Sequence, residues 1–137
     1  MDISVINISK GPFDFNKEAV KDLDLNKMSL DVTPRLRYSK ESDYLGYQID
    51  LIITQEKIQI LKGGFLIGFA IKDWSKDLKA GLDLNKEKEK LFKISKTAWL
   101  VATGIVAMQT SFEQFNGIIL PTINYEDLGK EVILIQV

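Results

Sequence analysis

The amino-acid sequence predicts an α+β domain in which an antiparallel four-stranded sheet packs against one long helix. Two observations support this fold class. In the first two thirds of the chain, apolar and polar residues alternate, as they do in strands with one buried face. Near Asn85 the apolar spacing changes to steps of three and four, which is typical of one face of a helix. The 137 residues suit a single domain, 1–137.

Four strands are expected from this alternation. Residues 3–9 alternate imperfectly, which predicts a strand with a bulge. Residues 28–38 alternate throughout, but Pro34 cannot donate a ladder hydrogen bond and so predicts an edge position or a bulge. Residues 43–54 and 58–72 form the other two strands. Because the links between residues 28 and 72 are short and polar, an antiparallel meander is expected.

The long helix is predicted over residues 86–112, with Asn85 as its N-cap. One apolar stripe is expected to lie on the sheet, and it comprises Leu91, Ile94, Ala98, Val101, Ile105, Met108 and Phe112. A second apolar column lies beside it and repeats every seven residues: Phe92, Trp99 and Val106. Since one stripe suffices for the sheet, the second column predicts a subunit interface in a homo-oligomer. The alternative is that other segments of the same chain cover it.

Apolar residues also occur in the two segments that flank the helix. They are Trp74, Leu78, Leu82, Leu84, Ile118, Ile119 and Leu120. Apolar residues in irregular segments can border a groove for another chain, so we hypothesise that these seven contact an extended client polypeptide. The alternative is that both segments close the edge of the core. After them, residues 132–137 predict a short terminal strand.

The composition excludes several classes of site. Cys and His are both absent, which removes disulfides, thiol nucleophiles, thiolate zinc sites and histidine-based triads. With 18 basic and 19 acidic residues the net charge is -1, which argues against nucleic-acid binding. Gly63, Gly64 and Gly68 lie within a strand and do not open a phosphate-binding helix. We expect no enzyme activity, no catalytic residue, no metal and no cofactor.

No targeting segment or membrane insertion is expected. The start of the chain lacks a basic region followed by an apolar run. The longest uncharged run, residues 97–112, is shorter than the roughly 20 apolar residues that a membrane span needs. The sequence therefore predicts a cytoplasmic protein.

The segment after the helix resembles the end of SecB-type export chaperones. It has a Gly-containing break at Gly117, an apolar stretch with Pro121, and the run Asn124-Tyr125-Glu126-Asp127-Leu128, which stands where that family has an Asn-aromatic-acidic-x-Leu segment. The run Gly63-Gly64-Phe65 is similar to the family's Gly-Gly-aromatic segment in the last strand before the linker. The resemblance spans residues 28–128.

This resemblance implies a four-stranded antiparallel sheet with helices on one face, pairing into dimers and tetramers. It also implies ATP-independent holding of unfolded polypeptides in long apolar grooves. Two features depart from the family: residues 132–137 replace its second, C-terminal helix, and its zinc-binding tail is absent. These departures put docking on the export motor in doubt, so protection of one partner, such as an antitoxin, stands beside a role in export.

Two other classes of function stay open at this stage. One is a carrier of a small apolar ligand built on a cup of sheet and helix, and the other is a plain oligomeric assembly subunit without a client. The carrier lacks a recognisable set of convergent polar groups. Binding of an unfolded client separates the chaperone from both alternatives.

Overall fold

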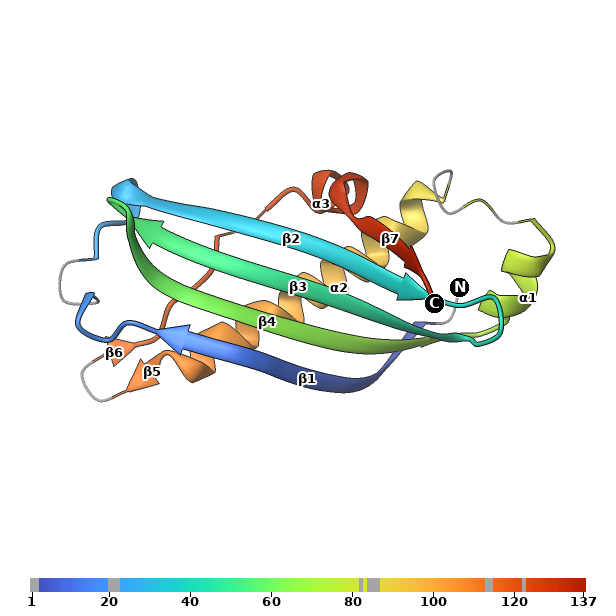
Figure 1. The fold of residues 1–137 in the computed structure, drawn as a ribbon, viewed down its shortest axis with the longest axis horizontal. Coiled ribbons are helices and arrows are strands. Elements are labelled where there is room, and N and C mark those ends of the chain that lie inside the picture. Colours follow the sequence, from blue (N-terminus) through green and yellow to red (C-terminus); the bar gives the residue numbers. More distant parts are fainter. Residues whose placement is uncertain (1–2, 20–22, 82, 84–86, 113–114, 122) are drawn as a thin grey trace.

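A computed structural model describes residues 3–19, 23–81, 83, 87–112, 115–121 and 123–137. One layer is a five-stranded sheet in the order β1-β4-β3-β2-β7, and α2 crosses one of its faces (Figure 1). In chain order the elements are β1 (Ile3–Phe15), a 3₁₀ turn η2 (Leu25–Lys27), β2 (Met28–Tyr38), β3 (Tyr44–Gln55), β4 (Ile58–Ile71), α1 (Trp74–Lys79), α2 (Lys88–Gln109), β5 (Ser111–Phe112), β6 (Phe115–Asn116), α3 (Tyr125–Glu131) and β7 (Ile133–Gln136). The α+β class is therefore as predicted.

The meander of β2, β3 and β4 forms the centre of the sheet. In β3 the odd-numbered residues from Leu45 to Ile53 are buried, whereas their even-numbered neighbours are only half-buried. This alternation is the expected result of one face lying under α2 and the other facing away. Tyr47 lies opposite Leu36 on β2 and Ile67 on β4, and all three are fully buried at the centre of the core.

The sheet differs from the predicted four antiparallel strands because β7 adds a fifth strand, parallel to β2. Pairing begins at Arg35 and runs to Tyr38. Pro34 therefore sits just before the paired stretch, on the part of β2 whose outer edge is open, so its missing N–H costs no bond to β7. The predicted bulge is absent, because the register between β2 and β3 runs without a shift at Pro34. β2 is an interior strand, so the edge prediction is correct only locally, at the residues of β2 that precede its pairing with β7.

Strand β1 is longer than the sequence predicted and continues to Phe15. The expected bulge is present between Val5 and Asn7, and a second register shift lies between Lys10 and Phe13. β1 pairs only with β4 and forms one border of the sheet.

Two polar contacts show where α2 lies on the sheet. The Tyr47 and Ser95 hydroxyls are 2.7 Å apart in the core and join the first half of α2 to β3. At the other end, Lys10 Nζ donates to Gln109 Oε1 at 3.0 Å and joins α2 to β1. The helix therefore crosses the sheet diagonally, as Figure 1 shows, and reaches β1 only near its C-terminus.

Helix α2 lies within the predicted range of 86–112, and its Glu89–Gln109 stretch is apolar and long enough by composition to cross a membrane. Its sheet-facing side is buried in the core, at Ile94, Ala98 and Ala102 among others. The same composition is found in a core helix of a globular domain. Packing on the sheet therefore accounts for only part of the predicted stripe, because Val101 and Ile105 are half-buried and Phe112 belongs to β5, after the end of α2. The prediction is wrong for Met108, which is 78% exposed on the side of α2 that faces away from the sheet.

Two short helices were missed by the sequence analysis. α1 and α3 have six and seven residues, and so few residues give less than two full turns of periodicity. α3 packs against the start of α2: a Cβ placed on Gly129 would lie 3.4 Å from the Phe92 backbone nitrogen. A small residue at this position lets the two helices approach closely.

Candidate functional site

The structure buries most of the described residues that were predicted to contact a client. Trp74 and Leu78 form the inner side of α1, while Ile118 and Leu120 enter the core after β6. Ile119 is 78% exposed. These burials correct the predicted contact set, because the four buried side chains already pack within the subunit. Leu82 and Leu84 lie outside the described residues.

The column predicted to form a subunit interface is also covered from within. Trp99 and Val106 are buried, and Phe92 is half-buried beside α3. The chain after β6 lies close to the last turn of α2, where the Ile118 N–H donates to Thr110 Oγ1 at 2.7 Å. Segments of the same chain therefore take the place of a second subunit, which was the alternative reading of this column.

A different apolar surface lies on β1. Val5, Ile6 and Ile8 are 43%, 47% and 50% exposed, although they belong to a paired strand. β1 is the terminal strand of the sheet, so its outer backbone edge has no strand partner among the described residues. From Lys10 onward the register shift and Pro12, which has no N–H, interrupt this edge. The stretch before this interruption, residues 3–10, contains the bulge between Val5 and Asn7 and is called the β1 edge below.

The exposure of the β1 edge follows from the bulge and from the diagonal path of α2. Before the bulge, Val5 lies opposite Phe69, and after it Ile8 lies opposite Ile67, so both side chains are on the α2 side of the sheet. A hydrogen bond joins α2 to β1 at Lys10, whereas the side chains of Val5 and Ile8 are exposed. The sequence carries one signal for this surface: three aliphatic residues within four positions exceed what one face of a strand can hold.

A second exposed row lies on the outward side of α2. Leu100, Gly104 and Met108 are four residues apart and therefore lie on one line along the helix. Leu100 is 54% exposed and Met108 is 78% exposed. These three residues, the α2 outward row, have no charge among them, and they lie on the side of the helix opposite the sheet.

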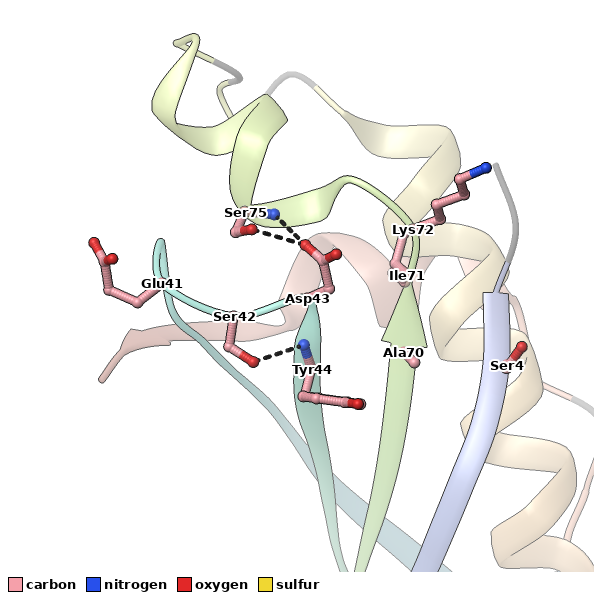
Figure 2. Close-up of a pocket in the computed structure, with 9 residues that line it drawn as sticks. All are labelled: Ser4, Glu41, Ser42, Asp43, Tyr44, Ala70, Ile71, Lys72 and Ser75. Carbon is pink, nitrogen blue, oxygen red and sulfur yellow. Dashed lines mark hydrogen bonds between the residues drawn. The ribbon is translucent and has the colours of Figure 1, made fainter.

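The structure also contains a polar hollow of about 540 Å³ at the end of the sheet near α1 (Figure 2). It is lined by Ser4, Glu41, Ser42, Asp43, Tyr44, Ala70, Ile71, Lys72 and Ser75. An apolar-ligand carrier would instead need an enclosed apolar lining. No group of three or more acidic side chains suited to hold a metal occurs in the part of the chain that was described.

Asp43 accepts hydrogen bonds within this hollow. Its Oδ1 accepts two hydrogen bonds from Ser75, from the backbone N–H and from the hydroxyl, both at 2.8 Å (Figure 2). The backbone hydrogen bond is the main cause that holds the pKa of Asp43 below its ordinary value, and the hydroxyl adds to it. Asp43 thus attaches the β2–β3 turn to the first turn of α1, which is a structural task.

No family model and no curated protein matches this chain. Among solved structures, it is similar to the Mycobacterium tuberculosis SecB-like chaperone Rv1957, solved in complex with a ChAD peptide from the HigA1 antitoxin, with 11% identity, a TM-score of 0.42, and coverage of 90% of this chain and 88% of that one. It is also similar to a protein of unknown function from Streptococcus agalactiae, with 11% identity, a TM-score of 0.36, and coverage of 89% and 94%.

Proposed function

We propose that this protein is a non-catalytic, ATP-independent chaperone-like protein that binds unfolded or partner polypeptide as an added strand on the β1 edge. One observation carries the proposal: residues 3–10 combine a free backbone edge with exposed Val5, Ile6 and Ile8. Free N–H and C=O groups of an edge strand pair readily with an extended chain, and neighbouring side chains add affinity.

This geometry implies broad recognition. Backbone pairing is independent of the client's sequence, and three aliphatic side chains favour any extended segment with aliphatic residues at alternate positions. The β1 edge would pair with a client segment of similar length, with an irregularity opposite the bulge between Val5 and Asn7. With a net charge of -1 there is no strong field to select clients by charge. Affinity for any one client should therefore be weak to moderate.

The protein's setting and assembly belong to the same proposal. We place it in the cytoplasm, where its clients would be precursors for export or one dedicated antitoxin, the two roles that the SecB resemblance implies. We further propose that copies associate through the α2 outward row. Leu100 and Met108 are exposed there, whereas Trp99 and Val106 are already buried within the single chain. This arrangement leaves the β1 edge free for clients.

The test is suppression of aggregation. A chemically denatured client is diluted into buffer with and without the protein, and light scattering is followed for several unrelated clients. The unmodified protein should suppress scattering, and the effect should survive moderate salt because apolar burial and backbone pairing carry it. The variant Val5→Lys/Ile8→Lys should lose at least about threefold in suppression at equal concentration, since charges on an edge strand discourage pairing.

Ile58→Lys is the matched control. Ile58 is 54% exposed at the start of β4, away from the β1 edge, so the same chemical change there should leave suppression intact. Equal losses in both variants would refute the assignment to the β1 edge. Absence of suppression by the unmodified protein for every client would refute general client binding. A second copy on the edge instead of a client would be revealed by a dimer that Val5→Lys/Ile8→Lys dissociates.

A further inference from the structure

The segment that follows β6 crosses beside α2 as an extended strap before α3 begins (Figure 1). Along residues 117–121, called the strap below, Ile118 is 6% exposed, Ile119 is 78% exposed and Leu120 is 5% exposed. This is the alternation of an extended chain that rests on an apolar surface with every second side chain inserted. The positions that receive Ile118 and Leu120, called the strap site below, therefore already hold an extended aliphatic segment.

Few contacts other than these two side chains hold the strap. Among the described residues, the strap makes no backbone–backbone hydrogen bond to a helix or strand. The Ile118 N–H is bonded to a side chain, the Thr110 hydroxyl, which in turn donates to the Val106 carbonyl at 2.7 Å. Pro121 has no N–H to offer. The strap thus differs from β1 to β4, whose ladders join them along their length.

The strap also has a built-in turning point at its start. Gly117 has a φ of +95°, and a Cβ placed there would lie 2.4 Å from the Ala107 carbonyl oxygen. Only glycine allows the chain to leave β6 in this direction and pass so close to the last turn of α2.

We propose that the strap is an internal, displaceable occupant of the strap site, and that a client segment with two aliphatic side chains at alternate positions replaces it. The proposal rests on the proposed function in one respect: the protein must bind extended polypeptide. An attached segment competes at an effective concentration in the millimolar range. A client that contacts only the strap site is therefore excluded, whereas one that also pairs with another surface can displace the strap.

This inference reverses the expected sign of a mutation. If Ile118 and Leu120 were direct client contacts, replacing them with serine would weaken client binding. If they block the strap site, the same replacement empties it and strengthens binding of an extended aliphatic peptide. Ile119→Ser, at an exposed position of the same segment, makes the same chemical change without emptying the site.

The first experiment uses a fluorescein-labelled peptide with the protein's own sequence 116–124. Fluorescence anisotropy should show at least about tenfold tighter binding to Ile118→Ser/Leu120→Ser than to the unmodified protein or to Ile119→Ser. Circular dichroism and thermal melting establish that each variant is folded. Equal affinities for folded variants would overturn the inference.

Two further measurements keep the test decisive if the double variant does not fold. Thr110→Val removes the hydrogen bond to the Ile118 N–H but keeps the volume of the side chain, and it should tighten peptide binding by about threefold. In the unmodified protein, hydrogen exchange at the Ile118 amide should accelerate when a denatured client is added, because the hydrogen bond of this amide to Thr110 is lost. Unchanged or slower exchange there with a client bound would overturn the strap inference alone, whereas failure of any client to bind counts against the proposed function.

Discussion

Replacing Tyr47 with phenylalanine tests whether α2 lies on the sheet as described. The Tyr47 side chain is fully buried, and its hydroxyl lies 2.7 Å from the Ser95 hydroxyl on α2. Burial raises the pKa of Tyr47 to about 12, although the hydrogen bond from Ser95 acts in the opposite direction. The Tyr47 hydroxyl therefore tests two properties: the hydrogen bond between α2 and β3, and the exclusion of water from this contact.

The expected magnitude has two parts. At pH 7, Tyr47→Phe removes the hydrogen bond and should lower the free energy of unfolding by about 1 kcal/mol. At alkaline pH the unfolded chain, where tyrosine has its ordinary value of 10.0, ionises before the folded one. The contribution of the neutral hydroxyl is thus complete below about pH 10 and is lost as the pH rises through 12. At pH 11 this loss amounts to about 1 kcal/mol in the unmodified protein, and the phenylalanine variant does not suffer it.

Urea denaturation followed by tryptophan fluorescence measures the difference in the free energy of unfolding between the unmodified protein and Tyr47→Phe, called the gap below. Trp74 and Trp99 are both buried and will report unfolding. The gap of about 1 kcal/mol in favour of Tyr47 should hold from about pH 7 to about pH 9 and should close or reverse near pH 11. Groups other than Tyr47 titrate in both proteins and cancel in the difference.

The matched control is Tyr44→Phe. Tyr44 is 60% exposed at the start of β3, so the loss of its hydroxyl should change the stability by less than about 0.5 kcal/mol. A gap for Tyr47→Phe that stays constant between pH 7 and pH 11 would mean that this hydroxyl is not buried. The placement of α2 over β3 would then be wrong.

Two further predictions concern the acid limb and the assembly. Asp43→Asn should flatten the loss of stability between about pH 5 and about pH 3, because the lowered pKa of Asp43 gives a contribution that is present above its ordinary value of 3.8 and disappears as the pH falls; acid titrations of stability with equal slopes in both proteins would contradict this. Leu100→Lys/Met108→Lys should shift the particle mass measured by light scattering toward the monomer while the thermal melting temperature changes little, because both side chains are exposed in the single chain; a monomeric unmodified protein at high concentration would exclude self-association.

The sequence by itself was sufficient to predict the long elements, in which the periodic pattern repeats several times. The bounds predicted for β2 agree with the structure, and those predicted for β3 and β4 are within one residue of it. The bulge near the start of β1 and the change of spacing before α2 were also readable. The reason is that in a strand or helix with one buried face, apolar residues recur at the fixed spacing of that element, so the pattern is visible within the segment itself.

The client and interface residues were not readable in the same way. Helical spacing identified Trp99 and Val106 as apolar positions, and composition identified Ile118 and Leu120 in an irregular segment, but neither signal shows whether another chain or this one covers them. That decision depends on α3 and the strap, which are too short or too irregular to leave a periodic pattern. In the same way, a four-residue run such as β7 carries no information on its direction beside β2.

The sequence thus determined which segments form strands and helices with an apolar side, and the tertiary structure decided which of these side chains leave water and what they pack against. Ile8 shows the difference most clearly. It is an aliphatic residue of a strand and lies on the α2 side of the sheet, yet it is 50% exposed because α2 crosses the sheet diagonally and is joined to β1 at Lys10. The crossing angle of a helix on a sheet is set by packing between distant segments, so no local pattern in β1 can contain it.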